Sequence, residues 1–149
     1  MPFTRLHRLL DANHVDYQTI HHPTAYSAQE TAAVAHVPGR ELAKAVIVRI
    51  DGALAMVVQS ASSQVSLGRV KAAAGARDVH LANEEEFRDW FPDCELGAMP
   101  PFGNLYGMEV FVTEALTRDD EIAFNAGTHT ELIRLRYADY AKLAHPVVI

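Results

Sequence analysis

Residues 42–59 read LAKAVIVRIDGALAMVVQ, and this stretch decides the fold. Residues 42–50 are apolar and rich in β-branched side chains, which is typical of a strand. The dipeptide Asp51-Gly52 favours a two-residue hairpin turn, and residues 53–59 then return as a second strand. The stretch therefore predicts a β-hairpin in the first half of the chain.

Strands and helices are predicted on both sides of this hairpin. Further strands are expected over residues 15–21, 79–82, 109–112, 121–124 and 130–136. Helices are expected over residues 4–13, from Ser27 to about His36, from Ser66 to about Ala74, from Asn83 to Pro92, and over residues 138–144. The second and fourth of these helices begin with a capping box, formed by Ser27 with Glu30 and by Asn83 with Glu86. This mixture indicates an α/β (mixed α+β) fold, with a mixed sheet and helices packed around it.

Size and charge narrow the function classes. The 149 residues fit a single domain, which we expect to span residues 1–149. With 13 basic and 19 acidic side chains, the net charge of −6 argues against DNA or broad nucleic-acid binding by charge, although local contact with one end of an RNA remains open. We expect no membrane partner, because no apolar run approaches the length of about 18 residues that a spanning helix needs. Cys94 is the single cysteine, so an internal disulfide is impossible and a cytoplasmic protein is expected.

Lys44 is the first residue that suggests a function. Strand alternation places it on a face with other residues of the strand, namely Leu42, Val46, Val48 and Ile50, opposite Ala43, Ala45, Ile47 and Arg49. An ammonium group on an apolar face is unfavourable unless it is paired or reaches water. Lys44 therefore either keeps its charged head in water at the strand end or directs a cation into a pocket for a phosphate, carboxylate or carbonyl.

Two loops are the other candidates. Residues 97–103 read GAMPPFG, in which the prolines fix φ and the glycines permit positive φ. Such a loop can direct its remaining amides, for example those of Ala98 and Met99, toward a developing oxyanion; the alternative is a rigid turn. Residues 124–129 read FNAGTH, where Asn125 and Thr128 could orient the His129 imidazole or a water; the alternative is a solvated histidine.

The chain lacks the common motifs of metal and nucleophile chemistry. It contains no HExxH, no Cys/His ladder with zinc spacing, and no GxSxG elbow. We therefore expect no metal site, no cofactor and no covalent intermediate.

Four segments in this order resemble the YbaK-like, prolyl-tRNA-synthetase-associated editing domains. They are His22-Pro23 leading to Ser27-Ala28-Gln29-Glu30-Thr31-Ala32, then Leu42-Ala43-Lys44-Ala45-Val46, then residues 97–103, and finally residues 124–129. The resemblance covers nearly the whole chain and implies a barrel-like mixed sheet surrounded by helices. It also implies a free-standing factor that hydrolyses the ester of a mischarged aminoacyl-tRNA, typically tRNA(Pro) carrying a small amino acid.

The resemblance also implies roles for individual residues. Lys44 matches the functional lysine of the family, Gly97 and Pro101 match its GxxxP loop, and His129 matches a position that is histidine in many members. Substrate contacts are implied for the remaining matched positions, which are Ala98, Met99, Pro100, Phe102, Gly103, Gly127, Thr128, His22 and Tyr26. The implied partners are the acceptor end of aminoacyl-tRNA and a prolyl-tRNA synthetase or elongation factor.

The interpretation of the residues and the family resemblance both require Lys44 and the 97–101 loop to meet around one small hollow. The rival functions are a non-catalytic module that binds an amino acid, a nucleotide or a synthetase in the same pocket, and a metal-dependent hydrolase that uses some of the eight histidines.

Overall fold

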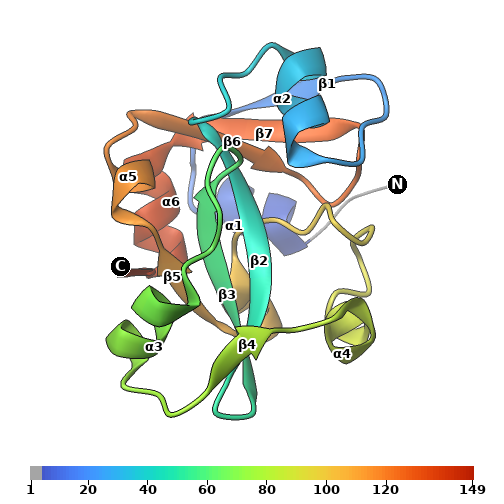
Figure 1. Ribbon diagram of the computed structural model, residues 1–149. Helices are drawn as coiled ribbons and strands as arrows, with labels where there is room; N and C mark the ends of the chain where they lie inside the picture. The colour runs from blue at the N-terminus through green and yellow to red at the C-terminus, as the bar shows by residue number, and fades with distance from the viewer. Residues whose placement is uncertain (1–4) are drawn as a thin grey trace.

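The computed structural model describes residues 5–149 and shows a twisted mixed sheet with helices around it (Figure 1). Within this range eight strands pair in the order β1-β7-β6-β2-β3-β5-β8, and β4 pairs with β2 beside this path. The strands are β1 (Tyr17–His21), β2 (Leu42–Ile50), β3 (Ala53–Ser60), β4 (Val79–Leu81), β5 (Glu109–Val112), β6 (Glu121–Asn125), β7 (Glu131–Arg136) and β8 (Val147–Val148). The ladders β2–β6, β3–β5 and β5–β8 are parallel, and the others are antiparallel. The expected mixed sheet is therefore confirmed.

The central hairpin forms as its sequence predicts. Strands β2 and β3 pair in register from Ala43 opposite Ser60 to Ile50 opposite Ala53. Asp51 and Gly52 connect them with φ of 48° and 90°, the two positive values that a tight hairpin turn requires. In Figure 1 this hairpin runs down the middle of the molecule, while β1 and β7 run across its top.

Three helices begin directly after the caps that the sequence predicts, Ser27, Ser66 and Asn83. The described helices are α1 (Arg5–Ala12), α2 (Ala28–Ala35), α3 (Leu67–Ala74), α4 (Glu84–Phe87), α5 (Glu114–Thr117) and α6 (Tyr137–Ala144), with 3₁₀ turns η1 (Arg88–Trp90) and η2 (Gly103–Tyr106). Both capping boxes are present, with Ser27 and Glu30 at α2 and with Asn83 and Glu86 at α4. Thr4, the first residue of the expected N-terminal helix, lies outside the described residues. Within those residues no helix is long and apolar enough to span a membrane.

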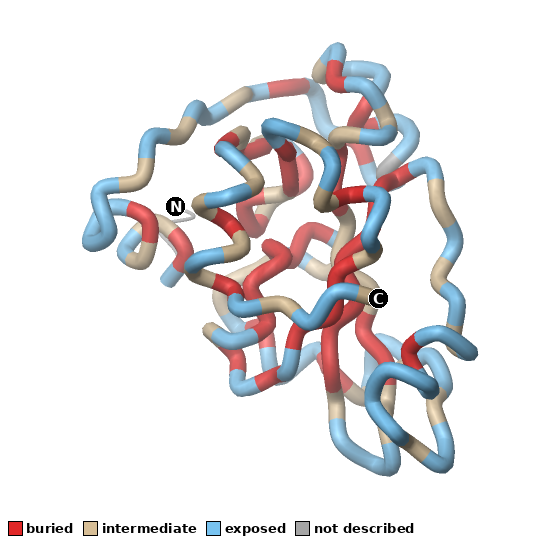
Figure 2. Tube along the Cα trace, turned by 90° about the vertical axis from the view of Figure 1, so that its left-hand side faces the viewer, coloured by how far each residue is buried: buried red, intermediate tan, exposed pale blue. Residues whose placement is uncertain are grey.

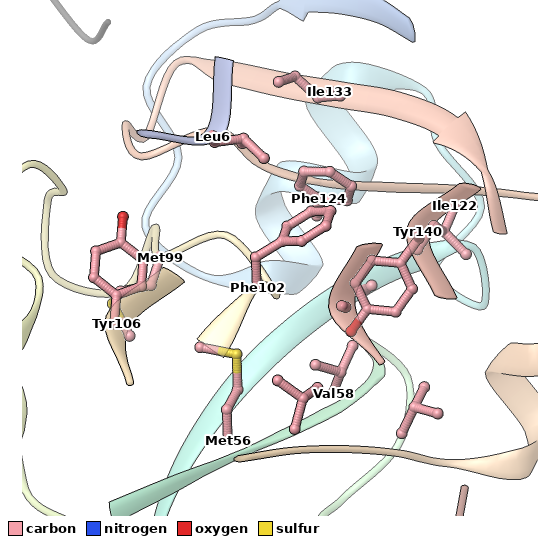
Figure 3. Packing of buried hydrophobic residues seen from close by; sticks show 14 of the residues in the cluster. Leu6, Met56, Val58, Met99, Phe102, Tyr106, Ile122, Phe124, Ile133 and Tyr140 are labelled. Atoms are coloured by element: carbon pink, nitrogen blue, oxygen red, sulfur yellow. The ribbon is translucent and has the colours of Figure 1, made fainter. Parts of the chain in front are cut away.

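The two faces of the sheet are packed differently. The inner face carries the main core, to which α1 contributes Leu6 and Leu10, while aromatic side chains fill the centre. Figure 3 shows Phe102 against Phe124 and Tyr140, with ring centroids 5.6 and 5.1 Å from that of Phe102. The buried stretches of Figure 2 follow these central strands, whereas the connecting loops are largely exposed.

The outer face carries two smaller apolar clusters. One includes Leu42, Ala123 and Leu132 together with Ala32 of α2. The other includes Val48 and Val57 together with Val70 of α3. Strand alternation therefore divides β2 as predicted, because Ala43 and Ile47 pack in the inner core.

A pair of glycines tests how tightly the inner core is filled. An alanine Cβ at position 103 would lie 3.1 Å from Val110 Cγ2 and 3.2 Å from Met56 Cβ, whereas one at Gly68 in α3 meets nothing within 4 Å. Gly103→Ala should destabilise the fold by about 1–3 kcal/mol through overpacking. Gly68→Ala should stabilise it by up to about 1 kcal/mol through helix propensity. Urea unfolding midpoints measure both changes, and shifts of the same sign would contradict the packing.

Candidate active site

Backbone hydrogen bonds join the two loops that the sequence singled out. The Glu95 amide donates to Gly127 O at 2.8 Å, and the Gly127 amide donates to Ala98 O at 2.9 Å. The Glu95 carboxylate accepts the His129 amide at 2.7 Å, a bond strengthened by its charge. The 97–103 loop is thereby fixed against the turn that follows β6.

His129 lies at the junction of these loops. Its side chain is buried, and its Nε2 is 2.7 Å from the carbonyl oxygen of Leu96. A carbonyl oxygen only accepts, so Nε2 carries the proton and the Nδ1 lone pair of the neutral ring remains available. The Tyr26 ring is tilted by 57° against the imidazole with centroids 4.9 Å apart, and the Tyr26 side chain is largely exposed.

Gly97 is in contact with the same imidazole. Its φ of 84° is a left-handed value that a side chain strains, and an added Cβ would lie 3.3 Å from His129 Cε1. Glycine is therefore required here both by backbone conformation and by the nearness of His129.

The segment from His22 to Tyr26 is hydrogen-bonded to residues 129 and 130, next to the two joined loops. The His22 amide donates to Thr130 O at 2.9 Å, and the Ala25 amide donates to His129 O at 3.2 Å. His22 Nδ1 lies 2.8 Å from Pro23 O and must carry the proton, which leaves Nε2 as an acceptor. This Nε2 is buried and has no partner among residues 5–149. The structure thus brings His22, Tyr26, Gly97 and His129 together beside the turn that contains Gly127 and Thr128.

An open hollow of about 480 Å³ lies between this loop and β2, and we call it the loop hollow. Gly97 and Met99 line it on one side, and residues 45–47 line it on the other. The remaining wall consists of Leu81, Ala82, Asn83, Glu84 and Phe87. Leu81, Ala82 and Phe87 make part of this wall apolar, and Asn83 and Glu84 add polar groups to it.

The loop hollow coincides with an interruption of the sheet. The ladder between β2 and β6 ends at Ala43, and the ladder between β2 and β4 begins at Val48. Ile47 O accepts from the Ala82 amide at 3.0 Å, so the backbone groups of Ile47 face the edge of β2 on which β4 and β6 pair. Ala45 lies two residues before Ile47, and its backbone N–H and C=O therefore point to the same edge. Within the described sheet these two groups of Ala45 have no ladder partner.

The amides of the loop do not all remain available. The Ala98 amide donates to Glu95 O at 3.0 Å, so the expected role of Ala98 as an oxyanion donor is corrected. The Gly97 amide faces only a weak acceptor, Met99 Sδ, at 3.3 Å. The Met99 amide has no hydrogen-bond acceptor within residues 5–149. Gly97 and Met99 therefore offer the loop's available donors, since the two prolines that follow have none.

The second half of the loop belongs to the core. Phe102 is completely buried, Pro101 O accepts from the Tyr140 hydroxyl at 2.8 Å, and Gly103 begins η2 against β5. Pro100 and Pro101 are buried as well. The structure thus places Phe102 and Gly103 away from the loop hollow, where they support the loop from behind.

Lys44 lies on the other face of β2 and lines a second open hollow of about 460 Å³, which we call the lysine hollow. Its other lining residues are Val46, Gln59, Gln64, Val65, Leu67 and Leu81. Val46 and Leu81 line both hollows, so the two adjoin. The expectation of one hollow is therefore wrong: alternation turns Lys44 away from Ala45 and Ile47, and two adjoining hollows take its place.

No metal centre emerges from the described residues. Within residues 5–149, no three His, Cys, Asp or Glu side chains are grouped so that they could hold a metal ion.

Comparison with known proteins gives consistent matches. Residues 22–143 match the model of the family described as "Aminoacyl-tRNA editing domain". A relative in Escherichia coli (strain K12), named "Multifunctional Ser/Thr-tRNA deacylase ProXp-y", is 29% identical over 153 residues, covering 97% of this chain and 89% of the relative.

Solved structures show the same fold. A candidate trans-editing enzyme for prolyl tRNA synthetase superposes with a TM-score of 0.82 at 19% identity, covering 97% of this chain and 92% of that chain. The hypothetical protein APE2540 superposes with a TM-score of 0.86 at 19% identity, covering 97% of both chains.

The Cys94 thiol beside this loop gives a test of the local packing. Burial raises the pKa of Cys94 to about 12; the contact with the Tyr106 hydroxyl at 3.3 Å lowers it in part, and the nearby Asp93 carboxylate raises it again. At pH 8 roughly one thiol in ten thousand is then ionised, against about a quarter in an unfolded chain. Iodoacetamide at pH 8 should therefore alkylate the urea-unfolded protein rapidly and the native protein hardly at all, as followed by mass spectrometry. Equal rates in the two states would contradict the raised pKa of this half-buried thiol.

Proposed function

The chain belongs to the aminoacyl-tRNA editing domain family, and from this premise we propose that it acts in trans as a deacylase of mischarged aminoacyl-tRNA. The substrate class is the ester between a small, wrong amino acid and the acceptor end of a tRNA, with tRNA(Pro) as the first candidate. The observation that carries the proposal is the loop hollow, where residues with unused backbone donors from two separate segments lie beside Gly97, which in turn contacts His129.

The reaction is hydrolysis by water. Water attacks the ester carbonyl carbon, the carbonyl oxygen becomes an oxyanion, and the tetrahedral intermediate collapses with the ribose oxygen as leaving group. The amides of Met99 and Ala45 stabilise the oxyanion, with the Gly97 amide as a third donor; one such donor is worth about 3–4 kcal/mol in the transition state. The proton of the attacking water passes to solvent or to the leaving ribose oxygen, and no covalent enzyme intermediate forms.

Two side chains complete the site. Lys44 approaches from the adjoining lysine hollow and stabilises negative charge on the substrate, either on a phosphate of the terminal nucleotide or on the developing oxyanion. His129 donates its Nε2–H to Leu96 O, so its Nδ1 is the ring atom left to accept from the attacking water or from the substrate amino group.

Selection at a second site suits this reaction. A hollow that admits the wrong amino acid and excludes the correct one performs the second step of double-sieve editing. The net charge of −6 implies weak intrinsic affinity for the tRNA body, so a prolyl-tRNA synthetase or an elongation factor supplies additional recognition.

A deacylation assay tests both the activity and the role of Lys44. The purified protein is incubated with tRNA(Pro) charged with alanine, cysteine, serine or threonine, and release of the amino acid is followed. Lys44→Ala should lower kcat/KM by about a hundredfold or more, as expected when a charge-stabilising group is removed. Lys71→Ala, an exposed lysine on α3, is the matched control and should retain wild-type activity. Undiminished activity of folded Lys44→Ala would reject the role of Lys44, and no release from any substrate would reject the deacylase.

Two glycines with similar backbone angles test the loop. Gly97 has a φ of 84° and Gly52 a φ of 90°, but only an alanine at position 97 would approach His129. Each alanine should destabilise the fold by about 1 kcal/mol or more, because both positions lie in the left-handed region. Gly97→Ala should in addition lower kcat/KM by at least tenfold, since a small displacement of positioned groups is enough for such a loss. Equal activity of the two variants at equal folded fraction would contradict the role of the loop.

A further inference from the structure

Three adjacent strands each place a polar side chain at the same level of the outer face. Lys44 on β2 pairs with Gln59 on β3, and the parallel register of Ala43 with Phe124 places Asn125 of β6 beside Lys44 on its other side. The row formed by Gln59, Lys44 and Asn125 lies between the two apolar clusters of this face. Polar residues at such a position need a reason, because an apolar row would pack without desolvating any polar atom.

The amide oxygens that flank Lys44 have no hydrogen-bond partner in the described part of the chain. Gln59 is 1% exposed, its Nε2 donates to Ser63 O at 3.2 Å, and its Oε1 is buried with no partner among the described residues. The orientation of this amide is fixed, because Ser63 O can only accept and must face the NH₂ group. Asn125 Oδ1 is likewise buried without a partner in residues 5–149. A buried acceptor left unpaired lowers stability, so Gln59 Oε1 is a position where a donor from a ligand would be stabilising.

The groups around Gln59 limit the kind of hydrogen-bond donor that its Oε1 can accept from. A second cation is disfavoured beside the Lys44 ammonium, which argues against the substrate α-amino group. A neutral hydroxyl fits, because it can accept from Lys44 and donate to Gln59 Oε1 at the same time. Apart from Gln64, the rest of the lysine hollow is apolar, with Val46 and Val65 available to a methyl group on the hydroxyl-bearing carbon.

We propose that Gln59 is a specificity-determining residue, whose side-chain carbonyl accepts a hydrogen bond from the hydroxyl of a β-hydroxy amino acid, serine or threonine, seated in the lysine hollow. This inference rests on the proposed deacylase function and names its substrate class. The ester lies in the loop hollow, and the side chain of the amino acid passes over Val46, which lines both hollows. Gln59 Oε1 is closed to water in the free protein, so the flexible stem of Lys44, directly opposite, moves aside as the hydroxyl enters.

A comparison of two substrates that differ by one oxygen atom tests Gln59. The same tRNA is charged with serine or with alanine, and kcat/KM for deacylation is measured for the wild type and for Gln59→Leu. The serine-to-alanine ratio should fall about tenfold in the variant, as expected for loss of one hydrogen bond at a buried acceptor. Gln18→Leu makes the same replacement at an exposed strand position on β1 and should leave the ratio unchanged. Gln59→Met, which is unbranched and close to glutamine in length, replaces Gln59→Leu if the latter is poorly folded by thermal unfolding.

The outcomes separate this inference from the proposed function. An equal loss on both substrates would show that Gln59 positions Lys44, and an unchanged ratio would show that a water or another group satisfies the acceptor; either result overturns the inference while the deacylase stands. If no aminoacyl-tRNA is hydrolysed, the deacylase falls, and the inference is decided by thermal stabilisation with hydrolysis-resistant 3′-seryl-amido and 3′-alanyl-amido adenosine. A serine preference of the wild type that is lost in Gln59→Leu supports the assignment, and equal stabilisation by the two compounds overturns it.

Discussion

Strand β2 is paired along one whole edge but only at its two ends along the other, and the site depends on this interruption. Strand β6 covers Leu42 and Ala43, β4 covers residues 48–50, and the stretch between them keeps unpaired backbone groups. An unpaired strand edge is normally a liability, because it presents donors and acceptors to any other chain. Here the interruption is short and lies beside the 97–103 loop, so it can serve a small ligand and not a further strand.

The loop reaches this position through its bonds to the end of β6. Residues 125–130 turn the chain from β6 into β7, and Glu95, Ala98 and Gly127 hold the loop to that turn. The two prolines and the packing of Phe102 on Phe124 then fix the far side of the loop in the core. Because β6 ends at the interruption of the sheet, a loop anchored to this turn arrives beside the unpaired stretch of β2. The donors are therefore positioned before any substrate binds, which is what electrostatic stabilisation of a transition state requires.

Local sequence patterns predicted most of the fold, because hairpin turns and helix caps depend on neighbouring residues. The hairpin, both capping boxes and the strand faces followed from residues a few positions apart. The short elements α5 and β8 were missed, since four and two residues show no periodicity and β8 forms only by pairing with β5. Candidate site residues were recognised by their motifs, but the partner of the Ala98 amide and the separation into two hollows depend on contacts that span the chain. Gln59 could have been found, because a two-residue turn at Asp51-Gly52 fixes the register that places it opposite Lys44.

The alternation of side chains along β2 also separates the backbone groups at the loop hollow from the side chains at the lysine hollow. Backbone donors of Met99 and Ala45 face the loop hollow, and a backbone amide is the same whatever amino acid the ester carries. The side chains of Lys44 and Gln59 face the lysine hollow, where a single substitution changes polarity without moving those donors. Under the proposed function, the main chain of β2 would hold the reacting group, while Lys44 of β2 and Gln59 of β3 would contact the substrate on the opposite face, because successive side chains point to opposite faces. Val46 and Leu81 line both hollows, and the bulk of these two side chains limits the size of a ligand group that can extend from one hollow into the other.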